Sequence, residues 1–368
     1  MKTSYFALAV IGMGPFVLCA QAQAADSAGA APSAVSVYGV LDAGIVAERG
    51  CAASCAGSKV SGGVASGSRL GVQGREALGD DVSAVFSLEA GIQNDTGQSE
   101  EGRLFGRQAY VGLDSRLGAL TLGRQYNLQY LTLTDVADPF KGGMAGSASN
   151  LAGYGVKRYD NTVKYATPAL RGMTASAIYS FGESPYSSAN NRAYGATLGY
   201  SAGAVNVSVS HQRKNNVILA SGTLPAIDMS ARNTLVAANV DLKVATAFAA
   251  VGVNKGYGSS PWDPGNAYSS LALSMSSSDS RDVLLGVSVP VRGFKLLASW
   301  VHKDDRDLAN RDATQVAVGV TYSLSRRSDF YASYAKIHNK NGARYTVGNA
   351  SDSGRGDAAL NLGFRHGF

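Results

Sequence analysis

The chain has 368 residues, and its 33 Lys and Arg residues outnumber its 27 Asp and Glu residues, which gives a formal net charge of +6 at pH 7. The basic residues are scattered and form no basic helix or recognition motif, so the composition does not indicate a nucleic-acid-binding protein. The mean hydropathy of -0.03 does not distinguish a soluble protein from one whose apolar and polar residues alternate.

The N-terminal residues have the three parts of a secretory signal peptide. Lys2 is followed by an apolar stretch over residues 5–19 and by an Ala-x-Ala site that ends at Ala24. We expect residues 1–24 to be a cleaved signal peptide and residues 25–368 to form the mature protein as one domain. An uncleaved membrane anchor is the alternative, but the apolar run is short and is interrupted by glycine and proline.

The mature protein has two cysteines, Cys51 and Cys55, in a segment rich in Gly, Ser and Ala. In an exported protein an even pair indicates a disulfide that closes a small loop. A metal site is the other interpretation, but no His or acidic cluster accompanies the pair. We therefore expect a disulfide, no metal site and no cofactor.

Period-2 alternation of apolar and polar residues recurs along the mature chain, as expected for strands with different environments on their two faces. The segments 244–253 and 330–337 alternate poorly, and periodicity alone does not identify them as strands. The apolar positions of four clear examples are Tyr194, Ala196, Leu198 and Tyr200; Val205, Val207 and Val209; Val283, Leu285, Val287 and Val289; and Val316, Val318, Val320 and Tyr322.

Short and long connections alternate strictly between these segments. Fifteen connections join 16 strands, and an even-numbered antiparallel membrane barrel has tight turns at one end and long loops at the other. A soluble β-sandwich has no reason to make every second connection long. The sequence therefore predicts an all-β fold, a 16-stranded antiparallel transmembrane β-barrel with short periplasmic turns and long outer loops. The short connections are Glu76–Asp81, Asp114–Gly118, Thr167–Gly172, Ser201–Ala204, Val240–Lys243, Pro290–Gly293 and Leu324–Ser328, and the long ones are Arg49–Gly67, Gln93–Gly102, Asn127–Lys157, Gly182–Arg192, Arg213–Ala231, Asn254–Ser280, Lys303–Asp312 and His338–Asp357.

The last nine residues continue the alternation to the end of the chain. Leu360, Leu362, Phe364, His366 and Phe368 share one face of an extended strand. Chain termini of soluble domains usually fray, whereas the last strand of a membrane barrel must close the ring and lie in lipid. We therefore expect the final strand to end at Phe368.

These features resemble the general, trimeric outer-membrane porins of Gram-negative bacteria. Within the longest internal connection, Asp138–Gly143 looks like the Pro, Phe and Gly-Gly run of that family's third loop, although Lys141 places a cation among the usual acids. The other matching stretches are Ser68–Gly74, Gly106–Leu113, Leu122–Tyr126, Tyr159–Tyr165 and Arg365–Phe368. The resemblance covers the whole mature chain.

The resemblance implies how the protein is placed and assembled. The third loop should fold into the barrel and narrow it, and the chain should form a homotrimer. Phe368 should be the insertion signal read by the barrel-insertion machinery. The protein should reside in the outer membrane, in contact with its lipid and lipopolysaccharide, and pass small hydrophilic solutes and ions.

Basic residues of the strands are expected to line the lumen. An Arg that faces lipid at mid-depth costs roughly 2–4 kcal/mol, so the polar faces that carry Arg69, Arg158 and Lys164 must point inward. Asp160 is expected to share the inner face with Arg158, and Tyr159 to face outward. Alternation alone would point Arg107 outward, with the apolar residues of its strand. The resemblance instead places Arg107 inside, with Tyr110 facing outward.

The expected site is a narrow opening with charges of opposite sign on its two sides. Such a field favours hydrophilic solutes, and because basic groups outnumber acidic ones we expect a modest anion preference. Salt bridges that hold the loop in place are the alternative role for each cation. The expected basic wall is Arg69, Arg107, Arg158 and Lys164, and the constriction loop carries Asp135, Asp138, Phe140 and Lys141.

The sequence thus predicts a general diffusion porin, with a solute-selective channel on the same barrel as the alternative. An enzymatic barrel would need a His that activates a Ser. We expect no enzyme, because none of the four histidines lies in a recognisable nucleophile motif. The outer loops could also serve as an adhesin or receptor surface, which their sequences do not decide. The histidines are His211, His302, His338 and His366.

Overall fold

The computed structural model describes residues 33–51, 55, 57–79, 81–185, 187–215, 217–218, 227–228, 230–256, 259 and 277–368. The expected signal peptide lies outside the described residues. Sixteen long strands make up most of the described chain: β1 (Ala34–Arg49), β3 (Arg69–Gly79), β4 (Val82–Gln93), β6 (Gln108–Ser115), β7 (Gly118–Tyr126), β8 (Arg158–Ala166), β9 (Met173–Ser180), β10 (Ala193–Ala202), β11 (Val205–Lys214), β14 (Ala231–Asp241), β15 (Thr246–Gly256), β16 (Asp279–Val291), β17 (Phe294–Asp305), β18 (Ala313–Ser323), β19 (Ser328–Asn339) and β20 (Ala358–Gly367).

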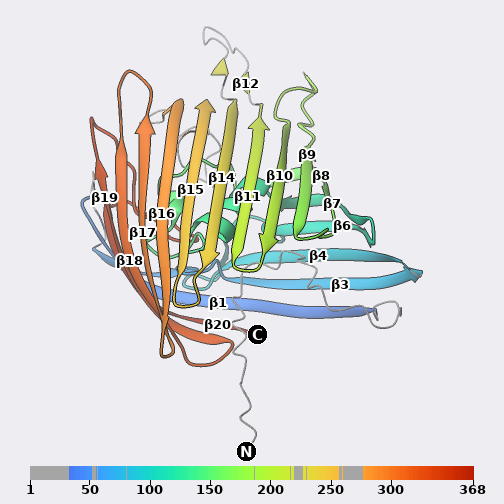
Figure 1. The fold of residues 1–368 in the computed structure, drawn as a ribbon, viewed down its shortest axis with the longest axis horizontal. Helices are drawn as coiled ribbons and strands as arrows, with labels where there is room; N and C mark the ends of the chain where they lie inside the picture. The colour runs from blue at the N-terminus through green and yellow to red at the C-terminus, as the bar shows by residue number, and fades with distance from the viewer. Residues whose placement is uncertain are drawn as a thin grey trace, which may run out of the picture.

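The long strands are antiparallel to their neighbours, and the sheet closes on itself because β1 pairs with both β3 and β20 (Figure 1). At the end of this seam the backbones of Gly39 and Phe368 exchange two hydrogen bonds of 3.1 Å. The predicted all-β, 16-stranded antiparallel barrel is confirmed. The strands β2 (Ser58–Gly62), β5 (Gln98–Ser99), β12 (Val217–Ile218) and β13 (Ile227–Asp228) are short additions.

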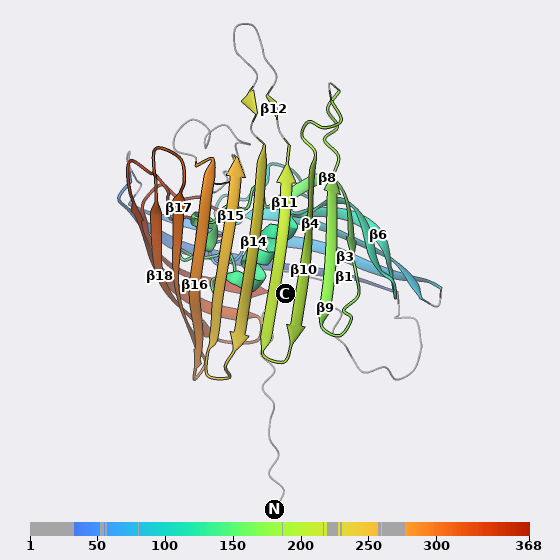
Figure 2. The same ribbon diagram turned by 45° about the horizontal axis from the view of Figure 1, so that its top comes forward.

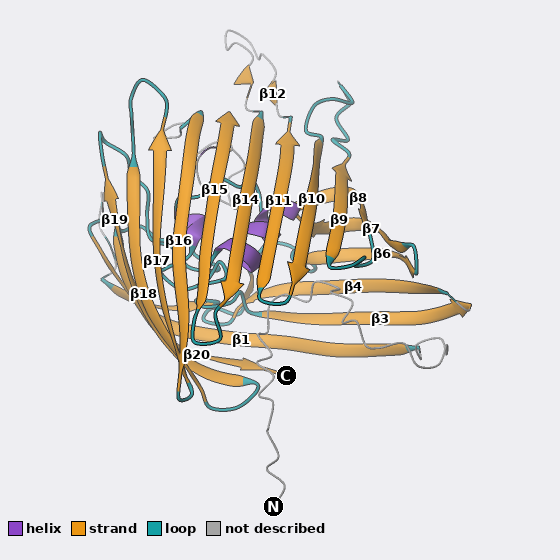
Figure 3. Ribbon diagram, in the orientation of Figure 1, coloured by secondary structure: helices purple, strands orange, loops and turns teal. Residues whose placement is uncertain are grey.

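The third long connection, residues 127–157, folds into the barrel as predicted. It begins with α1 (Leu128–Leu131) and the π-helical turn η1 (Thr132–Ala137), and a 3-10 turn, η2 (Ala148–Asn150), follows. The segments α1 and η1 lie against the inner faces of β11 and β14, and η1 also contacts β15. Figures 2 and 3 show the helical segments inside the ring. No helix among the described residues is both long and apolar enough to cross a membrane.

The inner wall under the third loop is apolar. Buried side chains of the loop and of β14–β19 form one cluster, so burial of apolar area holds the loop against this wall. The wall contributes Leu235, Ala237, Ala250, Leu284, Leu297, Val301, Ala313, Ala317, Tyr331, Ala335 and Ile337 to the cluster.

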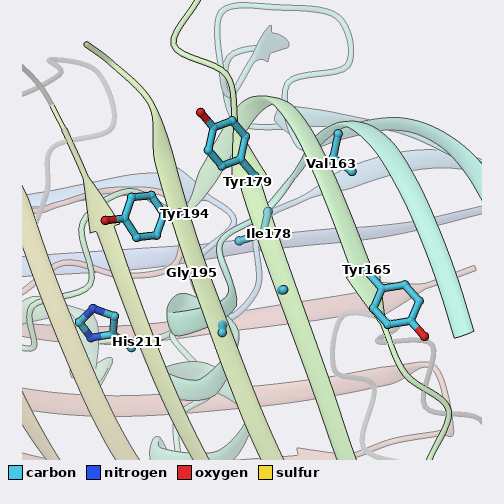
Figure 4. Close-up of a pocket in the computed structure, with 9 residues that line it drawn as sticks. Val163, Tyr165, Ile178, Tyr179, Tyr194, Gly195 and His211 are labelled. Atoms are coloured by element: carbon cyan, nitrogen blue, oxygen red, sulfur yellow. The ribbon is translucent and has the colours of Figure 1, made fainter. Parts of the chain in front are cut away.

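The outer face carries exposed apolar side chains along the strands, such as Val35 (69% exposed) and Val316 (55%). In Figure 4 the side chains of Tyr179, Tyr194 and His211 lie along a shallow apolar groove on this face. Aliphatic side chains with aromatic residues near them are the surface that a membrane requires of a barrel. The side chains that can contact solutes therefore lie on the inner face.

Candidate functional site

Asn127 ties the two ends of the third loop together. Its side-chain oxygen caps α1 by accepting a 2.8 Å hydrogen bond from the backbone N–H of Gln129. Its amide nitrogen donates to the carbonyl oxygens of Tyr154 (3.0 Å) and Val156 (2.8 Å). One buried side chain thus satisfies backbone groups at the start and at the end of the loop.

Asp138 fixes the tip of the loop. Its buried carboxylate accepts hydrogen bonds of 2.9 Å from the backbone N–H groups of Phe140, Gly142 and Ala148. The chain turns sharply here, with positive φ at Lys141 (52°) and Gly142 (73°), a conformation that glycine adopts readily. Burial raises the pKa of Asp138 to about 6, although the three hydrogen bonds favour the charged form. The Asp138 carboxylate therefore stabilises the conformation of its own loop.

The tip of the third loop packs against the inner faces of β16 and β18. A Cβ on Gly319 of β18 would lie 2.7 Å from the ring of Phe140, and one on Gly286 of β16 would lie 2.8 Å from the ring of Pro139. Only glycine lets the two rings approach the strands this closely. Phe140, 2% exposed, is thus an anchor of the loop.

Two other loops meet the third loop inside the barrel. The buried carboxylate of Asp42 on β1 accepts three hydrogen bonds of 2.9–3.1 Å from the backbone of residues 64–66 in the first loop. The third loop approaches this segment so closely that a Cβ on Gly143 would lie 1.9 Å from the carbonyl oxygen of Ala65. In the eighth loop, the N–H of Ala350 donates to the same segment (3.2 Å). Three loops therefore bound the opening.

Three of the predicted basic residues lie together around Tyr126. Its hydroxyl accepts hydrogen bonds of 2.7 Å from both Arg107 and Arg158, and the guanidinium of Arg158 lies 4.4 Å from the centroid of its ring. Glu89 on β4 accepts a 2.7 Å hydrogen bond from Arg107 and lies 3.5 Å from Nε of Arg69. The arginine side chains are at most 9% exposed.

Carboxylates of the second long connection complete this arginine cluster. Arg107 donates to Glu100 (3.1 Å), and Arg158 donates to Glu101. Charge-assisted hydrogen bonds of this kind are strong, and they place negative charge directly on the guanidinium groups. The cluster is therefore of mixed sign, and the role of these arginines as a basic wall of the pore stays a prediction.

The loop acids do not contact the arginines. Within the described part of the chain, neither Asp135 nor Asp138 forms an ion pair with the arginine cluster, and their expected position across the opening from the basic wall stays a prediction. Asp135 is half-buried, and burial raises its pKa to about 6 against the effect of the nearby charge of Lys141. Lys141 itself is exposed. The tip of the loop therefore carries one accessible cation and one acid of raised pKa.

A β-bulge in β8 changes which residues of that strand face inward, so the residues before and after the bulge follow different alternation. The pairing with β7 shifts by one residue between Tyr159 and Thr162, and Asn161 has a positive φ of 54°. Tyr159, expected outward, is buried inside and donates a 3.0 Å hydrogen bond to Gln212. Asp160, expected to share the inner face with Arg158, lies partly exposed beside Arg103 and Arg124.

Lys164 lies on the inner face of β8, apart from the arginine cluster. Its cross-strand neighbours are Thr121 on β7 and Ile178 on β9, which are both neutral. Among the described residues its ammonium has no hydrogen-bond or ion-pair partner. Lys164 therefore offers an uncompensated positive charge to the lumen.

The remaining predicted residues lie at the two ends of the chain. Cys51 and Cys55 form the predicted disulfide at the start of the first long connection. Glu48 lies beside them, but disulfide sulfurs are not the thiolates that bind metals. The ring of Phe368 lies over Gly39 at the seam of the barrel, where a Cβ would stand 2.3 Å from it.

Comparison with known proteins agrees with this architecture. A family model described as Gram-negative porin matches residues 7–342. An outer membrane porin protein of Bordetella pertussis is 32% identical over 372 residues, which cover 87% of this chain and 94% of that protein. The chain belongs to this family. It is an outer-membrane porin, as its relatives are named.

Further proteins are similar to the porin along most of its length. Outer membrane porin protein 32 of Delftia acidovorans is 26% identical over the full length of both chains. The anion-selective porin from Comamonas acidovorans has the same fold, with a TM-score of 0.73, 23% identity and coverage of 91% of this chain and 100% of that one. A trimer form of OmpT of Vibrio cholerae has a TM-score of 0.64 and 17% identity, and covers 92% and 100%.

Sequence reasoning missed the acids that compensate the arginines of the porin. Glu89 shares the inward face of β4 with Ser83 and Ser87, so alternation could have placed it in the lumen. Glu100 and Glu101 lie in a loop, where alternation gives no direction. No local pattern singled out their pairing with the arginines, because these contacts join separate connections.

Proposed function

We propose that this porin is a general diffusion channel with a modest preference for anions. The observation that carries the proposal is the free ammonium of Lys164 on the inner wall, beside an arginine cluster whose charges are largely compensated. Rings of one charge sign select ions of the other sign. Because compensated arginines contribute a weaker field, the preference should be modest, and Arg69, Arg107 and Arg158 should act mainly by shaping the opening.

The finer features of assembly belong to the same proposal. We infer that residues 1–24 are removed on export and that Phe368 is the signal read by the barrel-insertion machinery. We infer a homotrimer in contact with outer-membrane lipid and lipopolysaccharide. The trimer form of OmpT, which has the same fold, and the exposed apolar residues of β1 support this assembly.

Planar-bilayer recording of the mature protein tests the proposal. We expect conductance steps in groups of three and, across a KCl gradient, a reversal potential displaced toward that of chloride. Lys164→Gln should reduce this displacement. A reversal potential toward potassium would refute the anion preference, and the absence of steps from folded protein would refute the channel itself.

A further inference from the structure

Lys295 is a second lysine of the inner wall whose cross-strand partners are both uncharged. It lies on β17, and its cross-strand partners are Pro290 on β16 and Thr321 on β18. Leu296, the next residue, points outward and is 46% exposed, whereas Leu297 is buried under the third loop. Alternation therefore points Lys295 into the lumen, at the end of the barrel that carries the short turns.

The tip of the third loop brings Lys141 to the same region. Phe140 packs over Gly319, and Gly319 is the cross-strand partner of Leu297. Leu297 and Lys295 are successive inward-facing residues of β17, so the loop tip that packs beside Leu297 ends next to Lys295. Lys141 follows Phe140 directly and is exposed. The charges of Lys141 and Lys295 are close enough to interact.

The acids near these two lysines leave their charges uncompensated. The charge of Arg365 also reaches Lys295, but Arg365 is itself paired with Asp329 through hydrogen bonds of 3.1 and 2.8 Å. Asp135 is close enough for its charge to interact with Lys141 but forms no ion pair with it. Like charges held together are unfavourable unless a counter-charge joins them.

We propose that Lys141 and Lys295 together form a binding site for a small, doubly charged oxyanion on the short-turn side of the constriction. Each ammonium supplies three hydrogen-bond donors and no acceptor, and Thr321, the cross-strand partner of Lys295, carries a hydroxyl. A dianion would neutralise both lysines. The site rests on the proposed function, because solutes reach it only through an open channel.

Sulfate block of chloride current tests the site. Recording at roughly 0.1 M ionic strength limits screening, and sulfate is added to each side of the bilayer in turn. We expect voltage-dependent block of the wild-type channel. Lys141→Gln and Lys295→Gln should each raise the half-blocking concentration about tenfold, as expected for loss of one charge-assisted hydrogen bond.

Matched controls separate the site from general charge effects. Lys295→Arg keeps the charge and should keep the block, and Lys243→Gln, in the exposed short turn between β14 and β15, should leave the half-blocking concentration unchanged. Nitrate, a singly charged oxyanion, should block weakly in all variants. Heat-modifiable migration in SDS gels verifies that each variant is folded.

Each outcome decides one of the two proposals. No sulfate block, or the same half-blocking concentration in both glutamine variants, would overturn the site even if the reversal potential still shows anion preference. Block that depends on the two lysines in a channel with a potassium-directed reversal potential would support the site and refute the general anion preference.

Discussion

At the scale of single residues, the hydrogen-bond and ion-pair partners of each charged side chain decide how much net charge it contributes to the lumen. Tyr126 holds the guanidinium groups of Arg107 and Arg158 through one hydroxyl, and the glutamates around them supply the opposing charge. Lys164 has neither kind of partner in the described structure. On the proposed function, a lone lysine should therefore affect ion selectivity more than a cluster of arginines.

Asp135 should make the selectivity depend on pH. Because burial raises its pKa from 3.8 to about 6, the side chain takes up a proton between about pH 7 and pH 5. This removes a negative charge near Lys141, so anion preference should increase as the pH falls. Reversal potentials measured at pH 7.5 and pH 5 check this. In Asp135→Asn the change should be much smaller, and an equal change there would contradict the assignment.

Strand alternation predicted the direction of a side chain only where the strand is regular. Arg107 precedes β6 and reaches Glu89 inside the barrel, although alternation pointed it outward. Tyr110, which the resemblance placed outward, instead pairs with Ser87 on the inner face of the neighbouring strand, as alternation within β6 indicates. Tyr159 was assigned the wrong side because a β-bulge, which a sequence does not reveal, changes the parity of β8.

At the scale of elements, the third loop makes part of the barrel interior resemble the core of a soluble protein. The strands over 244–253 and 330–337 alternate poorly because their inner faces carry Ala250 on β15 and Tyr331, Ala335 and Ile337 on β19, which belong to the buried cluster with the loop. Both faces of these strands are therefore apolar or small. Periodicity failed where an internal loop replaces water.

The tip of the third loop should depend on Asp138. Asp138→Ala removes the acceptor of three backbone hydrogen bonds, which should destabilise the tip by on the order of 3 kcal/mol. We expect a larger and noisier single-channel conductance with an unchanged barrel. Asp304→Ala, at the exposed end of β17, is the control. A conductance equal to that of the wild type would show that packing of Phe140 alone holds the tip.

At the scale of the whole molecule, the architecture could be predicted because the lengths of the connections record which end of the barrel each one occupies. The third connection was placed at residues 127–157, which are the residues between β7 and β8. The contacts among the first, third and eighth loops could not be predicted in the same way. They depend on packing between segments far apart in the chain, such as Gly143 against Ala65.

Phe368 should matter more for assembly in the cell than for the stability of the finished barrel. Phe368→Ala keeps the backbone hydrogen bonds to Gly39, so the variant should refold in detergent. Its folded amount in the outer membrane should fall severalfold if the terminal ring is the insertion signal. Phe364→Ala, which removes an outward-facing ring of the same strand (39% exposed), is the control. Equal losses in both variants would indicate a general need for apolar surface.

The hydrogen bonds between Gly39 and Phe368 also determine when the barrel can close during synthesis and export. The strand β1 obtains its second neighbour only after β20, the final strand of the barrel, has been synthesised. Until then the chain has two open sheet edges, and open edges are sites of aggregation. Closure must therefore follow translation, and the exported polypeptide must cross the periplasm with both edges kept apart from those of other chains.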